Sequence, residues 1–151
     1  QTCALSDLTG IALTLEVGDA LLVGGEGFRM RQVVDNLVSN AIKYTPRGGT
    51  VATTARREGD DAVLTVRDTG IGIGPRDLER VFAPYFRAQS ATASGIAGTG
   101  LGMSIARTIV EEMRGTITLD SALGAGTTAT VRLPLAGRSP HDSRTTDGGT
   151  P

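Results

Sequence analysis

The spacing of apolar and polar side chains predicts strands around one long helix in the first half of the chain. Residues 11–17 alternate between apolar and polar side chains, which is the period of a strand with one buried face. Residues 28–42 carry apolar side chains three and four positions apart, the period of an amphipathic helix. Residues 51–57 and 62–68 predict two strands joined by a hairpin turn, and residues 20–23 a further short strand.

The second half of the chain predicts a loop between two helices, followed by two strands. Pro75 suits the first turn of a short helix over residues 76–81. Small and polar side chains without a regular period fill residues 83–98, which indicates a mobile loop. A new apolar stripe predicts a helix over residues 101–113. The last two strands are predicted over residues 116–120 and 127–133.

These elements predict an α+β domain. About three helices and five or more strands, not in simple βαβ alternation, favour a layer of helices on one face of a sheet. We expect the domain to cover residues 11–135, after a remnant of a preceding element at 1–10 and before a disordered polar tail at 136–151. A chain of 151 residues buries about 70% of its unfolded surface, so its core needs no disulfide or metal.

Composition and charge exclude several classes of function. With 15 basic and 16 acidic residues, the net charge of -1 argues against broad binding to nucleic acid or an anionic membrane. No apolar run approaches the roughly 20 residues of a membrane span, and the start at Gln1 has no signal-peptide pattern. Cys3 is the single cysteine and has no partner for an internal disulfide. Lys43 is the single lysine, which draws attention to its position.

The long predicted helix carries a polar edge beside its apolar stripe. Asn36, Asn40, Lys43 and Tyr44 recur at helical spacing, so they share one side of the helix. Two amides and an ammonium suit a phosphate with its metal, although a solvated helix face has the same pattern. Asn is an indifferent helix former, and two in one short helix interior are mildly unexpected.

Two glycine clusters follow this helix in the sequence. Asp68 ends a strand and is followed by Gly70 and Gly72, so its carboxylate could accept a hydrogen bond from an amine while the loop bends around a ring. A plain turn remains the alternative there. Gly98-Thr-Gly-Leu-Gly leads into a predicted helix, whose free amides form an anion site. A Rossmann site would need a strand immediately before the glycines, and residues 91–97 are loop-like.

The segment Phe82-Ala-Pro-Tyr-Phe-Arg precedes the predicted loop. Two core phenylalanines beside an exposed arginine would explain it, and so would the hinge of a lid whose Arg87 faces bound phosphates. Each of the four motifs is weak alone. Their order along the chain is what distinguishes them.

That order resembles the ATP-binding catalytic domain of sensor histidine kinases, in the family that also includes the DNA gyrase, Hsp90 and MutL ATPases. Residues 31–45 match the family's N box, 68–74 its G1 box, 82–87 its F box and 98–102 its G2 box. The resemblance implies a Bergerat fold, a two-layer α/β sandwich with a mixed sheet, about three helices on one face and a flexible ATP lid.

The resemblance also implies roles for individual residues. Asn40 corresponds to the Mg²⁺ ligand, with Asn36 beside it, and Asp68 to the residue that reads the adenine amino group. The other implied ATP contacts are Lys43, Tyr44, Gly70, Gly72, Arg87, Gly98, Thr99, Gly100, Leu101, Gly102 and, through water, Thr128. Asn36, Asn40, Lys43 and Arg87 are the implied catalytic set. Ala129 departs from the family, which often has Phe there, and we expect only looser core packing.

Asn36 separates branches of the family. The gyrase, Hsp90 and MutL ATPases have a glutamate there that activates water, whereas an amide has no useful basicity near neutral pH. The fitting reaction is transfer of the γ-phosphoryl group to a histidine, by positioning and Mg²⁺. An anti-sigma-factor-type serine kinase and a non-catalytic nucleotide-sensing module remain alternatives.

The phosphoacceptor is not recognisable in this chain. His141, the only histidine, lies in the polar tail without a helical pattern around it. The resemblance implies an acceptor histidine in a separate dimerisation domain and a response-regulator receiver domain as the next partner. We expect the fragment to be monomeric and not to autophosphorylate. Its parent is expected to be a homodimer, with this domain in the cytoplasm, and either membrane-anchored or soluble.

Overall fold

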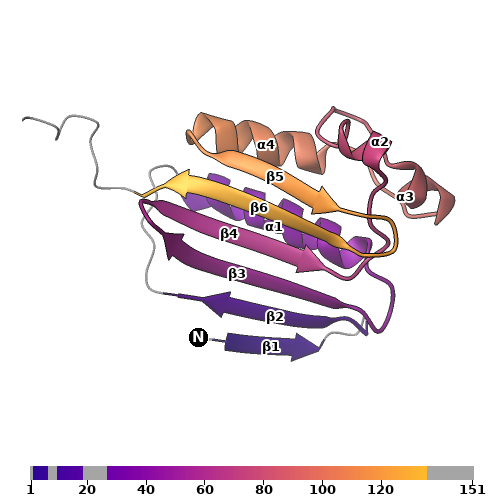
Figure 1. Ribbon diagram of the computed structural model, residues 1–151, viewed down its shortest axis with the longest axis horizontal. Coiled ribbons are helices and arrows are strands. Elements are labelled where there is room, and N and C mark those ends of the chain that lie inside the picture. The colour runs from indigo at the N-terminus through magenta and orange to yellow at the C-terminus, as the bar shows by residue number, and fades with distance from the viewer. Residues whose placement is uncertain (1, 7–9, 19–26, 136–151) are drawn as a thin grey trace, which may run out of the picture.

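The computed structural model describes residues 2–6, 10–18 and 27–135, in which one sheet carries two long helices on a single face (Figure 1). The sheet has six strands in the order β1-β2-β3-β4-β6-β5. They are β1 (Thr2–Ser6), β2 (Ala12–Val17), β3 (Thr50–Glu58), β4 (Asp61–Asp68), β5 (Thr116–Ser121) and β6 (Thr127–Pro134). The long helices are α1 (Gly27–Lys43) and α4 (Gly102–Glu112), and the short ones are α2 (Pro75–Leu78) and α3 (Gln89–Ala93). The predicted α+β architecture is confirmed.

The sheet is mixed because of one connection. β2 and β3 run parallel, and the chain between them includes α1, as a parallel pair requires a long crossover. All other neighbouring strands are antiparallel. Asp68, the last residue of β4, is in register with Thr127, the first of β6, so both lie at the same end of the sheet.

The core lies between the two long helices and the sheet. Val33, Leu37 and Ala41 repeat at helical spacing on the buried side of α1, as the apolar stripe predicted. Alternate residues of β4 and β6 point toward the helices because strand side chains alternate between faces. The other buried members of this cluster include Ala106, Ile109, Val110, Val51, Leu64, Val66, Ala129, Val131 and Leu133.

Several predicted boundaries differ from the structure. Residues 2–6, interpreted as part of a preceding element, form β1 and pair with β2 as an edge of this sheet. The predicted loop 83–98 contains α3, a single short helix whose small side chains give no apolar period. The short helix predicted over 76–81 ends at Leu78, and turns follow it. The predicted strand 20–23 and tail 136–151 lie outside the described residues.

Helices α2 and α3 lie together beyond one end of the sheet, near the start of α4 (Figure 1). This is the end at which β4 and β5 finish. The long helices themselves are ordinary in length, and no helix in the described part of the chain is long and apolar enough to cross a bilayer.

Candidate functional site

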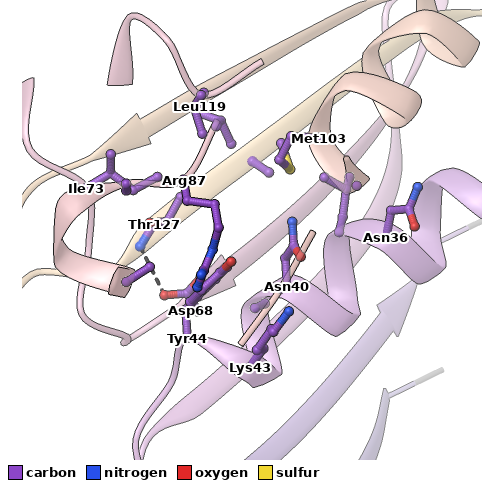
Figure 2. A pocket seen from close by; sticks show the side chains of 18 of the residues that line it. Asn36, Asn40, Lys43, Tyr44, Asp68, Ile73, Arg87, Met103, Leu119 and Thr127 are labelled. Carbon is purple, nitrogen blue, oxygen red and sulfur yellow. Dashed lines mark hydrogen bonds between the residues drawn. The ribbon is translucent and has the colours of Figure 1, made fainter. Parts of the chain in front are cut away.

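A cavity of about 250 Å³ lies between α1, the sheet and the segment from α2 to the start of α4 (Figure 2). Most of the site residues that the sequence predicted meet in it. Those lining it are Asn36, Asn40, Lys43, Tyr44, Asp68, Gly72, Arg87, Gly98, Thr99, Gly100 and Gly102. Gly70, Leu101 and Thr128 do not line it. Motifs separated by more than sixty residues in the chain therefore share one site.

Asp68 lies at the end of β4 with 8% of its surface exposed. Its Oδ1 accepts hydrogen bonds from the backbone N–H of Gly70 at 2.8 Å and of Thr127 at 3.1 Å. Burial raises the pKa of the carboxyl above its ordinary value, and these two hydrogen bonds oppose the rise. No described residue donates a hydrogen bond to Oδ2, which leaves that oxygen as an acceptor for a ligand.

The turn after Asp68 needs glycine because backbones approach closely. A Cβ at Gly70 would lie 2.3 Å from the carbonyl oxygen of Tyr44, and one at Gly72 would lie 1.9 Å from that of Ala122. Gly72 also has a positive φ of 70°. Gly70 thus shapes the turn against the end of α1 without itself lining the cavity, whereas Gly72 packs against the turn after β5 and lines the cavity.

The polar edge of α1 faces the cavity. Figure 2 shows Asn36, Asn40 and Lys43 on successive turns of this helix. The Nδ2 of Asn36 is buried without a hydrogen-bond partner. A buried unpaired amide is costly, so it calls for a group not present among the described residues. The amide has Nδ2 as a donor to an oxygen and Oδ1 as an acceptor toward a cation, so Asn36 fits either group.

The glycine-rich segment closes over this edge. A Cβ at Gly98 would lie 2.6 Å from the Nζ of Lys43, so a larger residue there would displace the end of that lysine side chain. Gly100 has a positive φ of 74°, and a Cβ there would meet the carbonyl oxygen of Phe86 at 2.7 Å. Helix α4 begins directly afterwards with no side-chain cap, so its first N–H groups remain available beside Gly102.

Arg87 enters the cavity from the chain between α2 and α3. One guanidinium nitrogen donates a hydrogen bond to the carbonyl oxygen of Ile96, and Nε is buried without a partner. Among the described residues no carboxylate forms an ion pair with Arg87. A partly buried cation without a counter-ion is unfavourable, and an anionic ligand would relieve that cost.

Sequence reasoning missed the apolar wall of the cavity and misplaced one residue of β6. Thr127 lines the cavity in place of Thr128, because β6 turns alternate residues to opposite faces and Thr127 shares its face with Ala129, Val131 and Leu133. That alternation was visible in the sequence and could have identified Thr127. Ala129 also lines the cavity, so its role goes beyond core packing. The other apolar lining residues include Leu37, Val66, Ile71, Ile73, Val81, Met103 and Leu119.

The described residues contain no cluster of three or more His, Cys, Asp or Glu side chains that could hold a metal alone. Magnesium seldom needs one, because it commonly binds one or two protein oxygens together with substrate phosphates and water. The amide oxygens of Asn36 and Asn40 meet that requirement at the cavity wall. The unpaired Nδ2 of Asn36 is a donor and fits an oxygen of a phosphate or a water beside such a cation.

Residues 25–137 match the family described as histidine kinase-, DNA gyrase B- and HSP90-like ATPases. This match covers most of the chain, so the chain belongs to that family, and it has the ATP-binding catalytic domain found in sensor histidine kinases. Membership of the family implies that it binds ATP. The expected Bergerat-type sandwich is likewise confirmed by the solved structures that resemble it.

The particular relatives are sensor kinases. The histidine protein kinase DivJ of Caulobacter vibrioides is 47% identical over 134 residues, which cover 86% of this chain and 22% of DivJ. SenX3 of Mycobacterium tuberculosis is 38% identical over 137 residues, covering 91% of this chain and 33% of SenX3. The mycobacterial sensor histidine kinase MprB has a TM-score of 0.76 at 30% identity, covering 83% of this chain and 84% of that one. The chain thus spans a third or less of these two curated relatives.

Proposed function

We propose that this domain binds Mg-ATP and transfers its γ-phosphoryl group to a histidine on a separate dimerisation domain, from which it passes to an aspartate of a receiver domain. One observation carries the choice of reaction. Asp68 is the only carboxylate among the described residues that line the cavity, and no histidine lines it. Two backbone amides already bind Asp68, and the site has no other strong base to activate water.

The residues divide the nucleotide between two parts of the cavity. Asp68 Oδ2 accepts a hydrogen bond from the adenine amino group, within walls formed by Ile73, Met103 and Leu119. Lys43, Arg87 and the N–H groups before α4 bind the phosphates. Figure 2 shows Asn40 and Lys43 on one side of Asp68 and the apolar side chains of Ile73 and Leu119 on the other.

Positioning provides the catalysis in this proposal. Asn40, with Asn36 beside it, would hold Mg²⁺ through amide oxygens, and the ion would neutralise charge on the phosphates when bound. The positive charge of Arg87 lies near the leaving oxygens. Its guanidinium exchanges the hydrogen bond to the carbonyl oxygen of Ile96 for one to a phosphate. The imidazole of the acceptor is itself the nucleophile, so the domain needs no base of its own. The setting that fits ATP chemistry is the cytoplasmic part of a sensor.

The test is phosphoryl transfer in trans. The chain is incubated with γ-labelled ATP alone, and then with the histidine-containing dimerisation domain of its parent. We expect acid-labile label on the added domain only, at a slow rate because the two partners are not held together. Asn40→Ala should abolish transfer. The matched control is Asp35→Ala, on the same helix but exposed and outside the cavity lining, and it should leave transfer unchanged.

Three results would contradict the proposal. Release of inorganic phosphate at the rate at which ATP loses its γ-label would indicate hydrolysis. Acid-stable label on a serine would indicate a serine kinase. Acid-labile label on the chain alone that disappears in His141→Ala would mean that the acceptor lies in this chain, at a residue outside the described part of the structure.

A further inference from the structure

The floor of the cavity dips at one position of the sheet. Val66 of β4, Ala129 of β6 and Leu119 of β5 stand side by side in register, and all three line the cavity. Ala129 is the middle residue of this row and the smallest. Because its neighbours in the row are larger, the floor is lowest above its methyl group. The row therefore forms an apolar recess centred on Ala129.

The walls of this recess are apolar as well. Leu37 and Ala41 of α1 and Met103 of α4 line the cavity above the row. Leu37 and Ala41 are buried, and Figure 2 shows Lys43 away from Met103 and Leu119. Apolar cavities of this kind do not hold ordered water and accept apolar groups. The recess is thus suited to a hydrocarbon substituent.

The recess lies directly inward from Asp68. Along β4 and β6, the pair of Asp68 and Thr127 lies two residues from the pair of Val66 and Ala129. Two residues of a strand span about 7 Å. A group that donates a hydrogen bond to Asp68 Oδ2 is therefore within reach of the recess through a short substituent.

From this geometry we propose that the recess admits adenine nucleotides that carry an apolar substituent on the amino nitrogen of the base, and that Ala129 sets this specificity. The proposal rests on the assignment of Asp68 to the adenine amino group. A singly substituted amino group keeps one N–H for Asp68 and directs its substituent elsewhere. A doubly substituted group has no N–H and cannot make the bond. The ligand class is accordingly the N6-monosubstituted adenine nucleotides.

The test compares three ligands by calorimetry on the full chain: ATP, N6-benzyl-ATP and N6,N6-dimethyl-ATP. We expect N6-benzyl-ATP to bind within about threefold of ATP and N6,N6-dimethyl-ATP to bind more than tenfold more weakly, since a buried acceptor loses its donor. Ala129→Leu fills the recess with an added isopropyl group. It should leave ATP within about threefold and weaken N6-benzyl-ATP by about tenfold or more.

The control variant and the alternatives keep the test decisive. Thr130→Leu adds similar bulk on the opposite face of β6, does not line the cavity, and should change none of the three affinities. If Ala129→Leu fails to fold, two other variants test the recess: Ala129→Val narrows it and Leu119→Ala widens it. These two variants should shift the ratio of the affinity for N6-benzyl-ATP to that for ATP in opposite directions. Exclusion of N6-benzyl-ATP by the unmodified chain, or an unchanged ratio in the variants, would overturn the proposal. Loss of phosphoryl transfer with ATP binding intact would count against the proposed reaction alone.

Discussion

The two walls of the cavity differ in burial and in how closely their backbones pack. The sheet wall, with Asp68, Val66 and Ala129, is buried and fixed by backbones in close contact, as a Cβ at Gly126 would lie 2.0 Å from the carbonyl oxygen of Asp68. In residues 83–101, which form the other wall, only Ala91 is buried. Base recognition and fold stability therefore depend on the same residues, whereas the phosphate contacts of Arg87 and of the glycine-rich segment depend on a stretch of chain that the core hardly restrains.

The hydrogen bonds of the second wall join residues within it or reach neighbouring turns, α2 and α4, and among the described residues none of them reaches a strand. The N–H of Tyr85 donates to the carbonyl oxygen of Gly100 at 2.9 Å, and the hydroxyl of Ser90 donates to that of Gly72 at 3.1 Å. Gly95 has open space where a Cβ would lie, unlike Gly126 of the sheet wall. Such a segment can rearrange without disturbing the core. We therefore expect substitutions in the sheet wall to change the free energy of unfolding, and substitutions in the second wall to change ligand binding with little effect on stability.

The largest expected effect is on the sheet wall. Gly126→Ala should lower the free energy of unfolding by about 2–5 kcal/mol, because a positive φ of 80° and a backbone clash both oppose a Cβ. Gly124→Ala, in the same turn, has a similar φ of 75° but open space, so it should cost about 1–2 kcal/mol. Urea unfolding measures both. Equal losses would mean that close packing at Asp68 adds nothing.

Asp68→Asn separates binding from stability within the sheet wall. The amide oxygen still accepts from Gly70 and Thr127, but the amide nitrogen places a donor where the adenine amino group would donate. ATP should bind about tenfold to over a hundredfold more weakly, for a loss of about 1–3 kcal/mol. The free energy of unfolding should not fall, because a buried charge is removed. Unchanged affinity in calorimetry would refute the adenine assignment.

How much the sequence predicted follows the same division. The long elements were predictable because their apolar periods serve the core, as in α1 and β4. Asp68 and the edge of α1 were predictable because motif and period coincide there. Helix α3 was not, since its small residues form no stripe, and Thr127 was missed because motif matching took precedence over strand alternation. The recess at Ala129 depends on which residues of β4, β5 and β6 are in register, which a single sequence does not define.

The pH dependence of binding gives a smaller effect with a definite sign. Burial raises the pKa of Asp68 above its ordinary 3.8. At a pH between the pKa of the unfolded chain and that of the folded domain, the folded domain therefore binds more protons than the unfolded chain. Through this group, stability falls as the pH rises across that window. ATP affinity moves the other way, because a protonated carboxyl loses an acceptor. We expect affinity to fall on acidification at a pH above 3.8 in the unmodified domain, and not in Asp68→Asn, when calorimetry is repeated across pH.

Asn40→Ala probes the border between the two walls. Removing one amide ligand should weaken ATP binding about two- to tenfold in the presence of Mg²⁺, as expected for a single polar contact, and change it little in the presence of a chelator. Asp35→Ala on the exposed side of α1 is the matched control. A similar loss with and without Mg²⁺ would assign Asn40 to the nucleotide itself rather than to the metal.

The smallest effect in free energy is expected in the second wall. Amides of residues 83–98 should exchange hydrogen rapidly without nucleotide, because little buried surface opposes their opening, and more slowly with a non-hydrolysable ATP analogue, by about tenfold at most. Arg87 links the two states, since it gives up its bond to Ile96 for the phosphates. Arg87→Gln should remove much of the slowing, while the amides of Val66 and Val131 in the core stay protected in every state. Equal exchange with and without nucleotide would make this segment a fixed connector rather than a lid.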